Sequence, residues 1–246
     1  MLPTPSLTTN LIDVKDKWFL LLDFKNALNG ISREAMLAEI RLHCPKATAW
    51  AECCYARHSH LFFGATRISS SSGAQQGDPL ASLFFSLILQ PFLVRLKSEC
   101  PGLILNVAFL DDITLAGNRA ALQQAFDSLQ QWGPEVGLHI NAQKSLVWCG
   151  EADSLPPEVD IADPLDRGVP CAPDYGFLLL GAPVGNISLA RDIVNHRIGK
   201  ISDIFDLLPS LNDAQVEFGL LRHCFSLPKL SYCLRTCDAS NLLPCY

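Results

Sequence analysis

The first residues do not have the pattern of a secretory signal, the sequence has no long hydrophobic run, and it carries little charge; each of these features argues against a class of protein. Its first residues, MLPTPSLTTN, contain neither the basic nor the apolar stretch of a secretory signal. The longest apolar runs, such as Trp18–Leu22 and Phe177–Leu180, are far too short to span a bilayer. We therefore expect an intracellular protein, cytoplasmic or nuclear, that is not secreted and has no membrane partner.

Several motifs that carry chemistry in other proteins are also missing. Ten cysteines occur without a Cys-x-x-Cys pair, so the sequence does not support a zinc ribbon or knuckle. Because the chain is not small and has no export signal, we expect buried free thiols in place of a disulfide framework. Neither of the two common glycine-rich phosphate-binding motifs is present. His58 and His60 could bind a metal from one strand, but ordinary surface or core roles are favoured.

The composition is that of a folded, acidic protein. Hydrophobic residues make up 49% of the 246 residues and charged residues 18%, which excludes a disordered chain and predicts one large domain or two small ones. The net charge of −6 argues by itself against binding to nucleic acid. However, residues 1–98 sum to +3, residues 99–186 to −9, and residues 187–246 to zero. The excess acid is therefore confined to the middle of the chain.

Strand-like and helical patterns alternate along the first part of the sequence. The apolar run Trp18–Leu22 predicts a buried strand that ends at Asp23. Ser32 is expected to cap the helix that follows, and Pro79 to stand at the entry of a long apolar helix over 80–97. The other expected elements are a helix over 47–57, hairpins over 60–69 and 103–116, a helix over 120–136, and strands over 138–140 and 145–148. This order predicts an α+β fold with a ferredoxin-like antiparallel sheet and packed helices.

The sequence changes character after residue 149. Residues 150–174 contain five prolines, seven acids and one base, which predicts a surface loop. A strand is expected over 175–180, closed by Gly181-Ala182-Pro183, and two helices from Ser188 onward, the second beginning near Asp213. We therefore divide the chain into residues 1–186, built on the sheet, and a helical segment over 187–246.

Three carboxylates stand where apolar strands end. Asp111 and Asp112 are adjacent at the tip of the second hairpin, and Asp23 follows the first strand. Neighbouring carboxylates raise each other's pKa, and a divalent cation removes that cost. If the two strands are neighbours, Asp23 and Asp111 form a hard-oxygen site suited to Mg²⁺, and two such ions about 4 Å apart serve phosphoryl transfer. Taken singly, Asp111-Asp112 also fits a solvated turn, and Asp23 a strand-end cap.

Three sequence blocks give these carboxylates a context. They are Asp23-Phe24-Lys25-Asn26-Ala27, Ser72-Gly73-Ala74-Gln75-Gln76-Gly77-Asp78-Pro79-Leu80 and Phe109-Leu110-Asp111-Asp112. Together they resemble motifs A, B and C of the reverse transcriptases of non-LTR retrotransposons. Gly137–Ser145 is similar to motif D, Phe177–Gly185 to the motif E primer grip, and the helical tail lies where a thumb begins. RNA-dependent RNA polymerases are the nearest alternative by chemistry, but their motif C more often reads Gly-Asp-Asp.

The resemblance implies a polymerase palm over 1–186, followed by a partial thumb, with RNA-directed DNA polymerase activity. Asp23 and Asp111 would hold two Mg²⁺ ions, or Mn²⁺, with Asp112 in or beside the site. The backbone carbonyl of Phe24 would also face a metal. The implied partners are an RNA template, a DNA primer and a deoxynucleoside triphosphate.

The resemblance also implies roles for residues around the carboxylates. Gln76 and Gly77 would line the nucleotide and template side, and Lys144 would lie near the phosphates. In the alternative, Gln76 is a polar residue at a helix entry and Lys144 a solvated turn lysine. Leu28 stands where the family usually has Phe or Tyr against the ribose 2′-OH, so weaker discrimination against ribonucleotides is expected. Leu110 replaces the common Ala near the primer terminus.

A non-catalytic function is the alternative to polymerase activity. Only 22 residues precede Asp23, so we expect most of the basic fingers to be missing and to be supplied by a larger polypeptide. On this alternative the chain is a catalytically inactive reverse-transcriptase-derived remnant or a partner-binding fragment.

Overall fold

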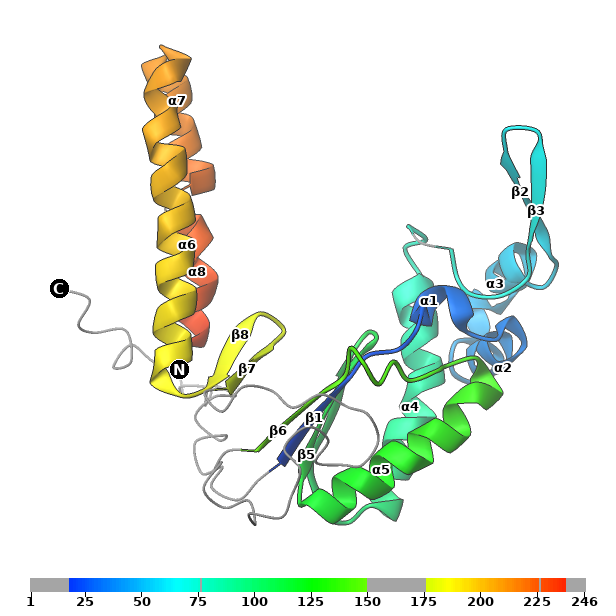
Figure 1. Ribbon diagram of the computed structural model, residues 1–246. Coiled ribbons are helices and arrows are strands. Elements are labelled where there is room, and N and C mark those ends of the chain that lie inside the picture. Colours follow the sequence, from blue (N-terminus) through cyan, green and yellow to red (C-terminus); the bar gives the residue numbers. More distant parts are fainter. Residues whose placement is uncertain (1–17, 76, 150–175, 226, 238–246) are drawn as a thin grey trace. The chain divides into compact units, whose positions relative to one another are not determined.

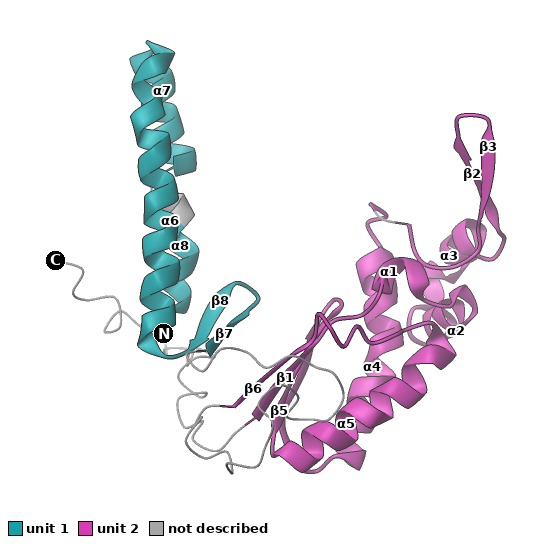
Figure 2. Cartoon of the chain, viewed as in Figure 1, with its two compact units in different colours: residues 1–15, 150–153, 172–246 teal, residues 16–149, 154–171 magenta. Residues whose placement is uncertain are grey.

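The computed structural model describes residues 18–75, 77–149, 176–225 and 227–237, and these fall into two compact units (Figure 2). Among the described residues, the units divide between Cys149 and Gly176. We call the residues up to Cys149 the first unit (magenta, labelled unit 2 in Figure 2) and those from Gly176 the second unit (teal, labelled unit 1). The sequence-based division at residue 186 places the segment 176–185 with the sheet, whereas this segment packs with the C-terminal helices. The expected loop over 150–174 lies outside the described residues.

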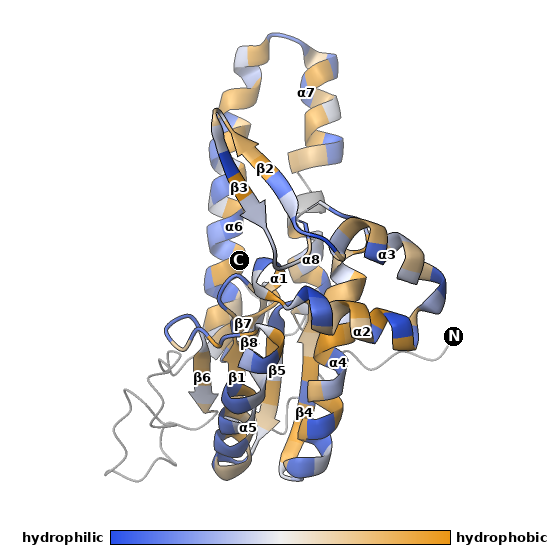
Figure 3. Cartoon of the chain, turned by 90° about the vertical axis from the view of Figure 1, so that its right-hand side faces the viewer, coloured by the Kyte–Doolittle hydropathy of each residue, from blue (hydrophilic) through white to orange (hydrophobic). Residues whose placement is uncertain are grey.

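The first unit is built on a four-stranded antiparallel sheet with the order β4-β5-β1-β6 (Figures 1 and 3). Its strands are β1 (Trp18–Leu22), β4 (Leu103–Phe109), β5 (Asp112–Gly117) and β6 (Leu146–Cys149). Two helices complete the pattern: α4 (Ala81–Glu99) precedes β4, and α5 (Arg119–Trp132) joins β5 to β6. This order of strands and helices is the split βαβ, ferredoxin-like arrangement, so the predicted α+β fold class is confirmed.

The central strand β1 explains why its sequence is apolar without alternation. Leu20 and Leu22 face the core that α4 and α5 cover on one side of the sheet. Phe19, on the opposite face, is equally buried and lies beside Trp148 of β6, with ring centroids 5.7 Å apart. A strand buried on both faces loses the period-two pattern of a half-exposed strand.

The long helix α4 lies close to its predicted position, whereas α5 begins as expected and ends early. Asn118 caps α5 by accepting a hydrogen bond from the Ala121 backbone N–H at 2.8 Å. The expectation of a continuous helix over 120–136 is wrong, because α5 ends at Trp132 and a 3₁₀ turn (Gly133–Val136) follows. Pro134 accounts for this break, since proline has no backbone N–H to continue the helical hydrogen-bond pattern.

By length and composition alone, α4 is apolar enough to cross a membrane, the one such helix among the described residues. The core helix of a soluble protein can have the same length and composition. The expectation that no segment could span a bilayer was based on unbroken runs of apolar residues. In α4 the apolar residues are interrupted by polar ones. Phe84, Phe85 and Ile88 of this helix belong to the core of the first unit.

Short elements between β1 and α4 form the upper part of this unit in Figure 1. They are α1 (Ala27–Gly30), α2 (Arg33–His43), a 3₁₀ turn (Pro45–Ala47), α3 (Thr48–Tyr55), β2 (Ser59–Phe63) and β3 (Thr66–Ser70). Ser32 caps α2 as predicted, since its hydroxyl accepts a hydrogen bond from the Ala35 N–H. The predicted hairpin is present as β2–β3, which pairs only with itself among the described strands.

The second unit combines a hairpin with helices. It contains β7 (Gly176–Leu179), β8 (Ala182–Gly185), α6 (Ile187–Leu207), a 3₁₀ turn (Leu208–Leu211), α7 (Ala214–Leu220), a π-helical turn (Leu221–Phe225) and α8 (Leu227–Thr236). Residues 181–183 were expected to close a strand. Instead, Leu180 and Gly181, both with positive φ, make a turn and Ala182 begins β8. Two helices were expected after residue 187, and α8 is a further one.

The prediction that the cysteines are buried holds for only some of them. Cys100 and Cys233 are buried, whereas Cys53, Cys54 and Cys224 are exposed free thiols. The prediction failed for the exposed cysteines because it relied on the apolar character of cysteine alone. No periodic pattern of apolar residues placed these positions on the buried face of an element. Cys171 and Cys245 lie outside the described residues.

Phe126→Ala should lower the free energy of unfolding by about 3–5 kcal/mol, because truncation of a large buried side chain leaves a cavity. Phe126 is 1% exposed and lies on the buried face of α5. Urea unfolding followed by circular dichroism measures the change. Phe63→Ala is the control, since Phe63 is 81% exposed and its loss should change stability by less than about 0.5 kcal/mol. Equal effects would contradict this assignment of the core.

Candidate active site

The site forms where the chain leaves β1. From Asp23 onward, one edge of the segment 23–32 is hydrogen bonded to residues 136–145. The Asn141 N–H donates to the Asp23 carbonyl at 2.8 Å, and the Lys25 N–H donates to the His139 carbonyl at 2.8 Å. The predicted strand over 138–140 is therefore wrong as an element: it is a single antiparallel bridge between Ile140 and Phe24.

A buried serine completes this edge. The Asp23 N–H donates to the Ser145 hydroxyl at 3.1 Å, and that hydroxyl donates to the Asn141 carbonyl at 2.9 Å. Ser145 is only 1% exposed. The Ser145 hydroxyl therefore gives the Asp23 N–H a hydrogen-bond acceptor just beyond the end of β1, where strand pairing no longer supplies one.

The other edge of the segment 23–32 is bound to residues 72–74. The Gly73 N–H donates to the Ile31 carbonyl at 2.8 Å, and the Ala74 N–H to the Leu28 carbonyl at 2.9 Å. The Ser72 hydroxyl donates to the Asn29 carbonyl at 3.1 Å. The segment that follows Asp23 is therefore clamped from both sides by distant parts of the chain.

Two glycines allow the clamp to close. Gly73 is buried with a φ of 70°, and a Cβ there would overlap the backbone of Asn29. Gly137 has a φ of 81°, and a Cβ there would overlap the carbonyl oxygen of Gly30. Both positions therefore need glycine for its left-handed conformation and for its missing side chain.

Polar contacts hold the loop over 70–78 in place. Arg33 donates through Nε to the Gly73 carbonyl at 3.0 Å and through Nη1 to the Ser70 carbonyl at 2.8 Å. The Tyr55 hydroxyl donates to the Asp78 carboxylate and accepts from the Gln75 N–H at 3.2 Å. Burial, followed by the hydrogen bond to Asp78, raises the pKa of Tyr55. The hydroxyl therefore stays protonated as a donor to Asp78 at neutral pH.

Strand register brings the three carboxylates to one corner. Leu22 pairs with Ile113, so the next step along the register sets Asp23 opposite Asp112. Asp111 lies in the two-residue turn between Phe109 and Asp112, which pair with each other. Leu110, the other turn residue, has a φ of 56°, a conformation that costs a side-chain-bearing residue about 1–2 kcal/mol. The hairpin thus holds a strained turn beside Asp23.

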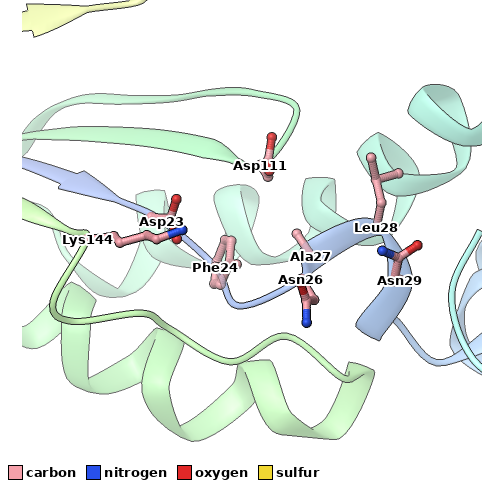
Figure 4. Close-up of a pocket in the computed structure, with 8 residues that line it drawn as sticks. All are labelled: Asp23, Phe24, Asn26, Ala27, Leu28, Asn29, Asp111 and Lys144. Carbon is pink, nitrogen blue, oxygen red and sulfur yellow. The ribbon is translucent and has the colours of Figure 1, made fainter. Parts of the chain in front are cut away.

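A pocket of about 240 Å³ opens at this corner (Figure 4). Asp23 and Asp111 line it from β1 and from the hairpin tip, and Lys144 lines it from the turn before β6. Its other lining residues are Phe24, Asn26, Ala27, Leu28 and Asn29. Asn26, with a φ of 48°, turns the chain from β1 into α1, which brings Leu28 and Asn29 to the same pocket.

Negative charge gathers at this corner, where Lys144 is the cation among the residues that line the pocket. The pKa of Asp112 is raised, first by partial desolvation of its carboxyl and then by the charges of Asp111 and Asp23. Among the described residues, no group of three or more ligating side chains already stands close enough to hold a metal. The side-chain oxygens at the pocket come from two carboxylates and two asparagine amides, a set that suits hard cations such as Mg²⁺.

The residues expected around the carboxylates divide into three groups. Asp23, Phe24, Leu28, Asp111 and Lys144 share the pocket, although the Phe24 side chain is mostly buried. Asp112 and Gly77 are not among the lining residues, and Gly77 has a φ of 93° that favours glycine without any crowding. Gln76 lies outside the described residues.

Sequence reasoning missed Ser145, Asn29 and the contact role of Gly73. Ser145 and Gly73 belong to sequence blocks that resemble the family motifs, so both residues were already part of the expected site region. Their contacts, however, are made across more than forty residues of chain. No local pattern reports such a contact.

Comparison with known proteins identifies relatives of this arrangement. The sequence model of a family described as "Reverse transcriptase (RNA-dependent DNA polymerase)" matches residues 3–182. The retrovirus-related Pol polyprotein from type-2 retrotransposable element R2DM of Drosophila melanogaster is 37% identical over 78 residues, which are 29% of this chain and 7% of the polyprotein. The chain therefore matches only a small part of that relative.

A solved structure of telomerase resembles the chain in fold. Telomerase from Candida albicans, solved in complex with a TWJ fragment of telomeric RNA, aligns with a TM-score of 0.50 and 13% identity over 92% of this chain and 41% of that chain. Apo telomerase from Candida tropicalis aligns with a TM-score of 0.44 and 13% identity, over 71% of this chain and 32% of that chain. At this identity the likeness concerns the fold alone.

Ser145→Ala should lower the free energy of unfolding by about 1–3 kcal/mol, because it leaves the partly buried Asp23 N–H without an acceptor. Urea unfolding measures the loss. Ser86→Ala is the matched control, since the Ser86 hydroxyl is exposed and bonds only within its own helix turn. A loss of less than about 0.5 kcal/mol in Ser145→Ala would show that Asp23 does not depend on this hydroxyl.

Asp112→Asn should make the metal-free protein more stable at pH 7. The pKa of Asp112 is raised in the folded protein, so its stabilising contribution is present below the ordinary pKa of 3.8 and is lost as pH rises through the folded pKa. The gain should grow between pH 4 and pH 7 and stay below about 1 kcal/mol, because solvent screens this exposed side chain. Thermal unfolding at several pH values measures it, with Glu34→Gln as the control. A gain that does not change with pH would refute the electrostatic cause.

Proposed function

The chain belongs to the reverse transcriptase family, and from this membership we propose that its first unit is the palm of an RNA-directed DNA polymerase that uses two metal ions. The observation that supports the proposal most strongly is the pocket shared by Asp23, Asp111 and Lys144. These residues come from three separate parts of the chain. In this family the reaction joins the α-phosphate of a deoxynucleoside triphosphate to the 3′-OH of a primer and releases pyrophosphate.

The residues at the pocket fit divalent cations. Mg²⁺ in nucleotide-processing sites usually takes one or two protein carboxylates together with substrate phosphates, and does not need a complete cage of protein ligands. Asp23 and Asp111 would supply these carboxylates, with Asp112 beside them and the Phe24 carbonyl as a further oxygen. When bound, the ions supply charge stabilisation for the attacking and leaving oxygens. Mn²⁺ would be accepted by the same oxygens.

Positioning is the work of the protein in this proposal. The clamp on residues 23–32 fixes the backbone that carries Asp23 and Leu28, so these two groups keep their places as substrate enters. Lys144 would place its ammonium group against the triphosphate and offset the charge of the departing pyrophosphate. Leu28 would face the sugar, where a side chain without an aromatic ring offers less steric exclusion of a 2′-OH.

The substrates and the cellular setting belong to the same proposal. We take the template to be RNA, the primer to be DNA and the site of action to be intracellular. The match to the R2 polyprotein covers 7% of that protein. A larger polypeptide or a partner is therefore proposed to contribute further contacts to primer and template.

An inactive remnant is the second candidate. Two observations favour it: Leu28 lines the pocket where the family usually has Phe or Tyr, and Leu110 replaces the common Ala at the hairpin tip. A chain no longer under selection for catalysis would keep its fold, which depends on the apolar core, while the residues of its site accumulate substitutions. Metal binding separates the two candidates.

Purified protein should extend a DNA primer on an RNA template in the presence of deoxynucleoside triphosphates and Mg²⁺. Asp111→Ala should reduce the extension rate by at least about 100-fold, because it removes an oxygen on which charge stabilisation depends. Glu34→Ala, an exposed acid on α2, is the control and should retain wild-type activity. Equal extension by both variants would rule out the assigned site.

Calorimetric titration with Mg²⁺ or Mn²⁺ tests the same site without catalysis. Wild-type protein should bind at millimolar metal, and Asp23→Asn should weaken this binding because it removes a charged oxygen ligand. Binding without extension would indicate a metal site that needs further polypeptide for activity. No binding at millimolar metal would favour the inactive remnant.

A further inference from the structure

The hairpin β2–β3 is unusually exposed for its composition. It extends from the end of α3 away from the rest of the first unit (Figure 1). Phe62 is 74% exposed and Phe63 81% exposed, and Leu61 and Ile68 are also exposed. A two-stranded hairpin is marginally stable alone, and a cluster of exposed large apolar side chains is uncommon unless it binds something.

The register of the hairpin divides its side chains into two different faces. His60 pairs with Ser69 and Phe62 with Arg67, and pairs that lie directly across an antiparallel ladder share a face. Because side chains alternate along a strand, these four residues form one face, which we call the cationic face. The other face carries Leu61, Phe63, Thr66 and Ile68 and is called the apolar face. Figure 3 shows hydrophobic and strongly hydrophilic residues side by side on the two strands.

The charge of this segment is opposite to that of the whole chain. Residues 53–77 contain no acid, two arginines and two histidines, in a chain whose net charge is −6. Arg57 lies just before β2 and Arg67 in β3, and both are exposed. Among the described residues no ion pair is made by either arginine. The segment is therefore suited to a polyanion.

We propose that the cationic face binds single-stranded nucleic acid. The Phe62 ring would stack on a base, and Arg67 and Arg57 would contact phosphates on either side of it. An aromatic side chain next to cations is the arrangement by which proteins hold single strands without reading their sequence. The proposal rests on the polymerase function above, because the expected occupant is the unpaired template strand.

The base of the hairpin joins it firmly to the candidate active site. Arg33 donates to the carbonyl of Ser70, the last residue of β3, at 2.8 Å and to its hydroxyl at 2.9 Å. The chain then runs directly into the loop whose Ala74 N–H bonds the carbonyl of Leu28, a pocket residue. A strand held on the hairpin would thus be fixed to the same compact unit as the pocket.

The apolar face suits a different occupant, the apolar surface of another polypeptide. The two adjacent phenylalanines separate these cases, since they are of one type and similarly exposed but lie on opposite faces. Fluorescence anisotropy with a labelled single-stranded RNA, at low salt and without metal, measures binding to the full chain. Phe62→Ala should weaken binding between about 5-fold and 100-fold, the usual range for losing one stacked base.

Phe63→Ala is the matched control and should change the affinity less than 2-fold. Arg67→Gln should lower the slope of log affinity against log salt by about 0.7–1, as expected for one lost phosphate contact. A labelled single-stranded DNA is the second arm, and a preference for it over RNA would identify a DNA strand as the occupant. Circular dichroism checks that each variant remains folded.

The outcomes that overturn the proposal are distinct from those that overturn the polymerase assignment. Equal weakening by Phe62→Ala and Phe63→Ala, weakening by Phe63→Ala alone, or no RNA binding by the wild-type chain would each refute the cationic face as the binding surface. Weakening by Phe63→Ala alone would point to apolar contacts on the other face. Asp111→Ala should bind RNA like the wild type. Failure of primer extension together with Phe62-dependent binding would count against polymerase activity of this chain by itself and would leave the binding surface in place.

Discussion

The two-sided clamp on residues 23–32 is the constraint on which the candidate site depends. A strand that leaves a sheet loses its ladder partners, and its backbone groups must then find others. Here residues 136–145 supply partners on one edge and residues 72–74 on the other. Both partner segments are themselves tied to the core, the first through α5 and β6 and the second through Arg33 and α4. The position of Asp23 is therefore set by the packing of the whole first unit and not by its own neighbours in the chain.

This rigidity explains how the fold tolerates an unfavourable group of charges. The register of β1 and β5 forces Asp23 toward Asp112, and the short turn adds Asp111. Partial desolvation, followed by repulsion from Asp111 and Asp23, raises the pKa of Asp112, and Leu110 adds backbone strain at the same tip. Local costs of this kind persist only where surrounding structure determines the geometry, and they gather at functional sites. The apolar core, built by α4, α5 and the buried face of the sheet, fixes the geometry of this corner.

Sequence alone predicted the parts of this arrangement that depend on local pattern. The strand β1, the helix cap at Ser32 and the positions of the carboxylates at strand ends were predicted correctly, because each depends on residues that are adjacent in the sequence. The helix end at Trp132 was missed because hydrophobic spacing continues past Pro134. The clamp was missed for a different reason: Gly73 and Ser145 act through backbone that is distant in sequence. Exposure of Cys53 and Phe63 was equally invisible, because residue type alone does not say which face of an element is covered.

The net charge illustrates how a sum over the chain can mislead. The acidic net charge argued against a nucleic-acid partner. However, this sum combines an acidic region with a region that contains no acid. Negative charge accumulates around the carboxylates, where divalent ions would offset it, and continues through residues 150–174. Residues 53–77 lack acid altogether and end at the loop that borders the pocket. Electrostatic attraction acts over roughly 10 Å at moderate salt, so a polyanion responds to the nearby hairpin and not to the distant sum. Local charge, read together with the fold that positions it, is therefore the better guide to the partner of this chain.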